Sequence, residues 1–185
     1  MINLKKAIAY ASGKDVRIAG GLGLTIDEPI VITENHHGFA VELERFVAKE
    51  VAVFYGMWNA DIGTATLRQL GDKHIDELQI NHLDNSDEPT ESRLYFDISA
   101  GYTNVGLPLK EVKSSDEVER IYSNKYHKVI EPIPHFYAAV YWALHQVDDE
   151  ELDLRSAKQA LALESDEEAK LVLSKLAECG FEVKL

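Results

Sequence analysis

The sequence has few cysteines, few basic residues and no long apolar stretch. Cys179 is the single cysteine among 185 residues, so no disulfide can form within the chain. The longest apolar runs, residues 51–58 and 136–144, fall far short of the roughly 20 residues that a membrane-spanning helix needs. Lysine and arginine number 19 against 32 acidic residues, which argues against nucleic-acid binding through a broad basic face. We therefore expect neither a membrane nor a nucleic acid as partner.

The remaining composition is that of a globular protein. Hydrophobic residues make up 45% and charged residues 28%, and the formal net charge is −13. Residues 7–11 follow two lysines, but this apolar stretch is too short for a signal peptide and charged residues follow at once. An amphipathic helix ended near Gly13 fits better. With one unpaired thiol, these features predict a cytoplasmic protein.

The first two-thirds of the chain are predicted to be rich in strands. Residues 29–33 are rich in β-branched side chains, and residues 35–38 have the composition of a turn. The apolar residues of segment 39–44 alternate with other residues, as in a half-buried strand. Residues 51–55, ended by glycine, are a further strand candidate. Between them, residues 46–47 fit a strand or a short helix equally well.

Turn residues divide the next segment. Glycine and aspartate at 71–72 predict a hairpin within residues 64–80, with a helix from Asp72 as the alternative. Residues 81–90 have the composition of a loop. Residues 93–99 predict a strand with Leu94, Phe96 and Ile98 on one face.

The last 33 residues contain two helix-capping patterns. Asp153 is placed to cap one helix, and Ser165 with Glu168 forms a capping box for a second. Gly180 stands where the second helix is expected to end, and residues 181–185 alternate like a strand. The second helix is predicted to pack through Ala169, Val172, Leu173 and Leu176.

This order of residues resembles the end of the C-terminal domain of the bacterial large-subunit ribosomal stalk protein. The matching pieces are Leu154-Arg155-Ser156-Ala157-Lys158 and the ungapped stretch from Ser165 to the C-terminus. The resemblance implies a small sandwich of three strands and three helices that docks translational GTPases. It also implies a strand over residues 136–144, although those residues fit a helix as well. Lys158 falls on a lysine of that family's factor-docking face.

The chain also departs from that family. Ser156 stands where the family usually has an acidic residue, and an acidic run at 148–153 replaces its glycine-rich segment. The flexible dimerising N-terminus has no counterpart. The resemblance therefore implies a shared fold fragment and not a ribosomal protein.

Patterns of catalytic or ligand-binding chemistry are weak. None of the seven histidines has the spacing of a zinc signature, so we predict no metal site and no cofactor. Residues 61–66 resemble the phosphate loop of sugar kinases and actin-like ATPases, but a turn at Asp61 and Gly63 is the preferred interpretation. The glycine-rich residues 20–24 lack the helix that a dinucleotide loop opens into. Cys179 is predicted to be a buried structural thiol.

An aromatic and acidic segment is the predicted partner-binding site. Two tyrosines and a histidine spaced by four would share one side of a helix or a strand, either half-buried or facing a partner. The neighbouring acids could steer a basic partner on approach. The predicted partner-binding residues are Tyr137, Tyr141, His145, Asp148, Asp149, Glu150 and Lys158.

These observations predict an α+β protein with a mostly antiparallel sheet, flanking helices and a C-terminal helix-helix-strand unit. Residues 1–130 are expected to form a strand-rich domain and residues 131–185 a smaller segment. The favoured function is a non-enzymatic module that binds another protein, and its charge favours a basic one. One alternative is a neutraliser of a basic toxin or a nucleic-acid mimic. Another is a small hydrolase or ligand-binding enzyme whose pocket gathers at least three of His74, His82, His127, His135, Asp97 and Glu131.

Overall fold

The computed structural model describes residues 4–84, 87–103, 109–114, 116–118, 153–160, 163–178 and 183–184. The chain divides into two compact units. The sheet unit contains residues 16–53 and 57–130, and the helical unit contains residues 1–15, 54–56 and 131–185. The helical unit thus includes residues 1–15 and 54–56, which the sequence-based division assigns to the first domain.

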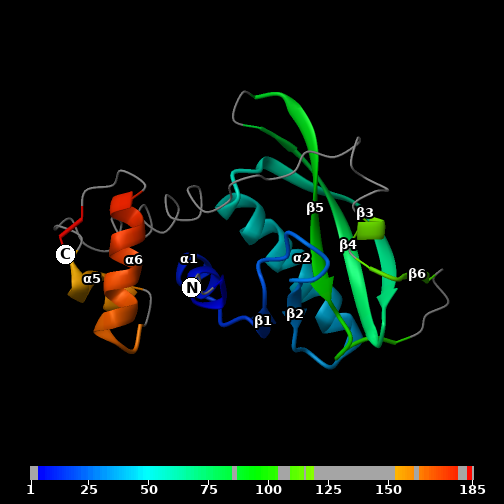
Figure 1. Cartoon of the computed structure of the whole chain (residues 1–185), viewed down its shortest axis with the longest axis horizontal. Helices are drawn as coiled ribbons and strands as arrows, with labels where there is room; N and C mark the ends of the chain where they lie inside the picture. Colours follow the sequence, from blue (N-terminus) through cyan, green and yellow to red (C-terminus); the bar gives the residue numbers. More distant parts are fainter. Residues whose placement is uncertain are drawn as a thin grey trace. The chain divides into compact units, whose positions relative to one another are not determined.

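Six strands of the sheet unit form one mixed sheet in the order β1-β2-β5-β4-β3-β6 (Figure 1). The β2–β5 and β3–β6 pairs are parallel and the other three pairs are antiparallel. This confirms the predicted α+β class with a mostly antiparallel sheet. The strands are β1 (Ile18–Gly20), β2 (Ile30–Ile32), β3 (Trp58–Leu70), β4 (Lys73–Leu83), β5 (Pro89–Asp97) and β6 (Lys110–Val112).

The predicted strand at residues 29–33 is confirmed as β2, but the strands predicted at 39–44 and 51–55 are wrong. One helix, α2 (His37–Phe54), passes through both segments. Its buried residues recur with the 3.6-residue period of a helix rather than the two-residue period of a strand. They are Ala40, Glu44, Val47, Ala48, Val51, Ala52 and Phe54.

The end of α2 is set by a glycine. Gly56 has a φ of 69°, a conformation that costs glycine little. The backbone N–H of Met57 donates a hydrogen bond to the carbonyl oxygen of Ala52 at 2.9 Å. This pairing satisfies a carbonyl group of the last helical turn, as in a Schellman motif. The chain can then turn directly into β3.

The hairpin predicted around Gly71 is confirmed, and the alternative helix from Asp72 is wrong. A two-residue turn joins β3 to β4, with Gly71 at a φ of 62°. β3 is longer than predicted, so residues 61–66 form neither a turn nor a phosphate loop but lie inside the strand. The loop predicted at 81–90 shrinks in the same way, because β4 continues to Leu83 and β5 begins at Pro89.

The strand register assigns side chains to two faces of the sheet. The helix-side face carries Asp76, Leu78 and Ile80 of β4, and opposite them Leu94 and Phe96 of β5. Leu94 and Phe96 thus share one face, as predicted, and both are buried, as is Ile98. α2 lies against the helix-side face (Figure 1). The other face carries Ile75, Glu77, Gln79 and Asn81 of β4.

Part of that second face is covered by the β1–β2 connection. Ile26 packs there in a cluster with Ile75 and Tyr95, which also includes Val112 and Val118. Gly23 allows the connection to approach closely, since a Cβ atom at this position would lie 2.9 Å from the Ile30 side chain. The glycines at residues 20–24 therefore serve packing in this sheet.

The helical unit contains α1 (Leu4–Ser12), α5 (Leu154–Ala160) and α6 (Asp166–Glu178). Helix α1 ends at Ser12, near Gly13 as predicted, and the φ of Gly13 is 67°. The predicted cap at Ser165 is also confirmed, while the return hydrogen bond of Glu168 comes from the residue before the cap. The Ser165 hydroxyl oxygen accepts a hydrogen bond from the Glu168 N–H at 3.1 Å, and the Glu168 carboxylate accepts one from the Glu164 N–H at 3.2 Å.

The structure describes only part of the stalk-like pattern. Residues 154–160 and 166–178 are helical, and Ala169, Leu173 and Leu176 are buried. Of the predicted closing strand at 181–185, Val183 and Lys184 are described and belong to no strand. Gly180, the other residues of that strand and the segment 136–144 lie outside the described residues. No helix within the described ranges is long and apolar enough to cross a membrane.

Candidate functional site

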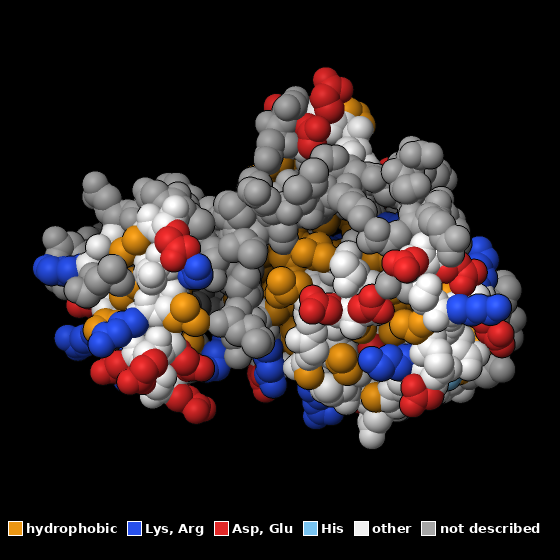
Figure 2. All heavy atoms as spheres, viewed as in Figure 1, with side chains coloured by type: hydrophobic (Ala, Val, Ile, Leu, Met, Phe, Trp, Pro, Cys, Tyr) orange, Lys and Arg blue, Asp and Glu red, His pale blue; other side chains and the backbone are white. Residues whose placement is uncertain are grey.

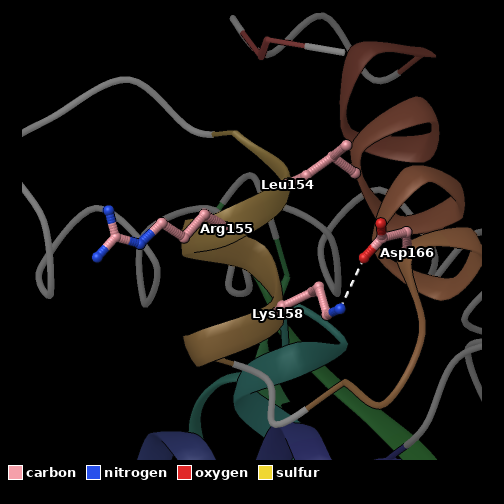
Figure 3. A pocket seen from close by; sticks show the side chains of 4 residues that line it. All are labelled: Leu154, Arg155, Lys158 and Asp166. Carbon is pink, nitrogen blue, oxygen red and sulfur yellow. Dashed lines mark hydrogen bonds and ion pairs between the residues drawn. The ribbon is translucent and has the colours of Figure 1, made fainter.

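Six of the seven predicted partner-binding residues lie outside the described part of the chain: Tyr137, Tyr141, His145, Asp148, Asp149 and Glu150. The seventh, Lys158, lies on α5 with its Nζ 2.6 Å from Oδ1 of Asp166 on α6. With Leu154 and Arg155, this pair lines an open depression of about 530 Å³. Figure 3 shows the Arg155 side chain pointing away from the ion pair.

The Lys158–Asp166 ion pair is exposed to solvent. Its hydrogen bond, and then the positive charge of Lys158, lower the pKa of Asp166. Solvent screens such a pair strongly, so it contributes little to stability. The depression beside it combines one apolar side chain with three charged ones and has no deep interior. It suits a surface contact better than the enclosure of a small molecule.

The groups proposed for an enzyme pocket do not converge among the described residues. His74 and His82 lie near opposite ends of β4. The His74 ring stacks on that of Tyr102, with their centroids 3.7 Å apart. Asp97 accepts hydrogen bonds from the backbone N–H and the hydroxyl of Ser99. His127, Glu131 and His135 lie outside the described ranges, within which no group of three or more potential metal ligands occurs.

His82 is held by two hydrogen bonds inside the sheet unit. Its Nδ1 lies 2.9 Å from the carbonyl oxygen of Leu83, so this nitrogen must carry the proton. Its Nε2 lies 2.8 Å from the hydroxyl oxygen of Ser92, which then donates to it. Both side chains are buried. The distance between Ser92 and His82 is that of a catalytic nucleophile and its base. Because both side chains are buried, however, a substrate cannot reach them.

A buried ionic cluster lies on the face of the sheet opposite α2. Glu77 is fully buried, and its carboxylate is paired with the guanidinium groups of Arg68 on β3 and Arg93 on β5. Both arginine side chains are also nearly buried, with exposed fractions of 3% and 8%. Charges removed from water require such pairing. The cluster joins the three central strands across the sheet.

A second buried acid lies between α2 and the sheet. Glu44 of α2 is only 2% exposed and is hydrogen-bonded to the carboxyl group of Asp76 on β4. Burial raises the pKa of Glu44 well above its ordinary value, and the negative charge of Asp76 raises it further. Burial also raises the pKa of Asp76. One of the two carboxyl groups must therefore hold a proton to donate to the other.

The exposed end of the β4–β5 hairpin brings aromatic, apolar and acidic side chains together. Trp58 of β3 lies opposite Leu83 of β4, which lies opposite Pro89 of β5. The next row on the same face contains Asp61, Asn81 and Glu91. Trp58 is 47% exposed, a large value for an indole ring. We call this region the hairpin-end surface; it comprises Trp58, Asp61, Asn81, Leu83, Asp84, Asp87, Glu88, Pro89 and Glu91.

Negative charge is concentrated on the hairpin-end surface. Five of its nine residues are acidic, and neither residues 58–67 nor residues 78–92 contain a lysine or an arginine. The side chains of Asp87 and Glu88 are exposed to solvent. Figure 2 shows acidic side chains at this end of the hairpin, at the top of the view. An exposed indole surrounded by carboxylates is well suited to contact a basic polypeptide.

The outer edge of β3 adjoins this surface. β6 pairs with β3 only through Arg68, Gln69 and Leu70. Among the described residues, no strand pairs with this edge along residues 59–67. Asp61, Gly63, Thr64 and Ala65 are exposed there. The register shifts between Trp58 and Asp61 and between Ile62 and Ala65 bend this part of the strand.

Comparison with known proteins gives no relative: neither a protein-family model, nor a curated protein, nor a solved structure matches this chain.

Sequence reasoning missed the hairpin-end surface. It assigned Asp84, Asp87 and Glu88 to a loop, which is correct for these three residues, but it gave Trp58 and Glu91 no role. Their proximity depends on the register of three strands, and the first register shift in β3 hides it from simple alternation. The absence of lysine and arginine from two separate stretches was the signal available in the sequence.

Proposed function

We propose that this chain is a non-enzymatic protein-binding module whose hairpin-end surface binds a basic partner. The concentration of five carboxylates around the exposed Trp58 carries this proposal. Aromatic residues are enriched in the centres of protein interfaces, and complementary charge increases the rate of association. The partner is expected to present lysine or arginine side chains around an apolar pocket or side chain.

The remaining observations favour binding over catalysis. His74 and His82 are far apart on β4, both ring nitrogens of His82 are hydrogen-bonded, and the described pocket is a shallow surface depression. The net charge of −13 extends the same attraction beyond direct contact. A basic toxin is one partner that would satisfy this chemistry. A single cysteine agrees with action in the cytoplasm, which forms part of the proposal.

Photo-crosslinking in the cells that make the protein tests this function. A photoreactive residue replaces Thr64, which is exposed on β3 beside the hairpin-end surface and carries none of its charges. We expect one dominant adduct, whose partner has an excess of lysine and arginine at the crosslinked segment. Raising the salt concentration of a lysate before illumination should reduce its yield, because salt screens exposed charges. No adduct, or an adduct with an acidic partner, would contradict the function.

A pair of matched variants separates local charge from net charge. Asp87→Asn with Glu88→Lys changes the charge of the hairpin end by +1 and +2, or +3 in total. Asparagine is chosen at position 87 because φ there is 59°, which asparagine tolerates. Asp27→Asn with Glu28→Lys makes the same +3 change on the β1–β2 connection. Only the first variant should lose the adduct, and equal losses would count against a local site.

A further inference from the structure

The open edge of β3 points to a particular mode of binding. We propose that the partner adds an extended segment with alternating basic and apolar side chains as a new strand along residues 59–67 of β3. This inference rests on the proposed function, and it specifies the conformation and the side-chain pattern of the bound partner. The edge and the hairpin-end surface meet at Asp61, which belongs to both.

Among the described residues, no strand pairs with this stretch of the edge, and the residues at its middle are exposed. Each exposed edge of a sheet presents N–H and C=O groups that another chain can pair with. β6 pairs only with the last three residues of β3, which begin at Arg68. The unpaired stretch therefore lies before Arg68, at residues 59–67. Exposure of Gly63, Thr64 and Ala65 shows that side chains from elsewhere do not cover the middle of it.

The two faces of β3 differ in chemistry, and this difference determines the side-chain pattern. On the helix-side face, Ile62, Ala65 and Leu67 lie opposite Ile80, Leu78 and Asp76. All three are exposed or half-buried, so apolar side chains of an added strand would extend this row. On the opposite face stands Asp61, in one row with Glu91. Because successive side chains of a strand point to opposite faces, the partner must alternate apolar and basic residues.

A second copy of this chain is a poor occupant of the same edge. Pairing two β3 edges would bring two copies of Asp61 and of the hairpin-end carboxylates near one another, where like charges repel. The two register shifts also bend the strand, and such bulges hinder edge-to-edge pairing of folded sheets. A flexible basic segment can follow the bend of the strand, and the carboxylates of the hairpin-end surface attract its positive charges.

Two synthetic peptides test strand addition on the full chain. The first alternates lysine and valine over roughly ten residues, the length of the open stretch, with blocked ends. The second has the same sequence but is N-methylated along its central half, which removes backbone donors and keeps every charge. We expect the first peptide to slow hydrogen exchange at residues 59–67, but not at β1 on the other sheet edge. The second should bind at least about tenfold more weakly.

Each other outcome has a distinct meaning. Equal binding of both peptides without slower exchange in β3 would overturn strand addition and leave the proposed function intact. Failure of both peptides to bind at low salt would contradict recognition of basic segments, and with it the function. Exchange at residues 59–67 that slows with protein concentration alone would assign the edge to a second copy. Binding that survives in Asp87→Asn/Glu88→Lys would separate the edge from the acidic surface and overturn the combined site.

Discussion

The carboxyl group of Glu44 on α2 shares a hydrogen bond with the carboxyl group of Asp76 on β4, at the interface between the helix and the sheet. Glu44 is the more deeply buried of the two, and burial is the main reason that its pKa is raised. We therefore assign the proton of the pair to Glu44. Asp76 is nearer to solvent and accepts the hydrogen bond.

This pairing predicts a stability that declines as the pH rises. The folded protein holds the Glu44 proton more tightly than the unfolded chain does, where the pKa is about 4.3. The contribution is complete below that value and is lost as the pH rises toward the folded pKa. Glu44→Gln keeps a neutral donor to Asp76, so it should stabilise the protein by about 1–3 kcal/mol at about pH 8. Thermal unfolding at several pH values measures this.

A neighbouring glutamate supplies the control for this prediction. Glu42 lies on the same helix and is exposed, so Glu42→Gln should leave the pH dependence of the melting temperature unchanged. The stabilisation by Glu44→Gln relative to the unmodified protein should be smaller at about pH 5 than at about pH 8. At the lower pH, Glu44 is protonated to a greater extent in both the folded and the unfolded state. Destabilisation by Glu44→Gln of the same size at both pH values would show that the carboxyl pair is assigned wrongly.

The same residue explains why α2 could not be predicted from the sequence. A helix is recognised by apolar residues three and four positions apart, and Glu44 interrupts that series between Ala40 and Val47. Without it, the alternation of Phe39, Val41 and Leu43 is the more regular pattern. Phe39 is in fact exposed, so the alternation has no structural meaning there. Features fixed within a few residues, such as the Gly71 turn and the Ser165 cap, were predictable because they depend on local chemistry.

The candidate site could be predicted only in its general character. Net charge indicated an acidic surface for a basic partner, and charge is a property of composition. The grouping of Trp58, Asp61 and Glu91 depends instead on strands distant in sequence and on a bulge between Trp58 and Asp61. Simple alternation assigns a residue to a face only while the register stays constant.

Removing the buried charge of Glu77 should destabilise the sheet unit strongly. Glu77→Gln leaves Arg68 and Arg93 buried without a carboxylate between them. The loss of one partner from a buried ionic cluster costs about 3–5 kcal/mol. Urea denaturation measures the change in the free energy of unfolding. Glu111→Gln, at an exposed position on β6, should change it by less than about 0.5 kcal/mol.

Replacing the whole cluster should cost less than removing its centre. Arg68→Met, Glu77→Leu and Arg93→Met together remove all three charges while keeping similar side-chain volumes. Apolar replacement of a buried ionic triad is often neutral or stabilising. We therefore expect the triple variant to be more stable than Glu77→Gln in the same urea titration. If the triple variant is the less stable one, further polar contacts of the arginines matter more than their pairing with Glu77.

The Ser165 cap predicts a localised effect in the helical unit. Ser165→Ala removes the oxygen that accepts from the Glu168 N–H and should cost about 1 kcal/mol. Ser174→Ala, within the same helix, makes the same chemical change away from the cap and should be neutral or slightly stabilising. Amide hydrogen exchange should speed up in the first turn of α6 for Ser165→Ala only. Equal exchange in the two variants would mean that the cap does not stabilise the helix.

The Lys158–Asp166 pair predicts a change in titration. The hydrogen bond from Lys158 is the main reason that the pKa of Asp166 is lowered, and the charge of Lys170 contributes least. Lys158→Met should therefore raise the pKa of Asp166 toward its ordinary value, as measured by the chemical shift of its carboxyl carbon across a pH titration. Lys170→Met, which removes one positive charge from the same helix, should raise it less. A larger effect of Lys170→Met would show that the pair seen in Figure 3 is not maintained in solution.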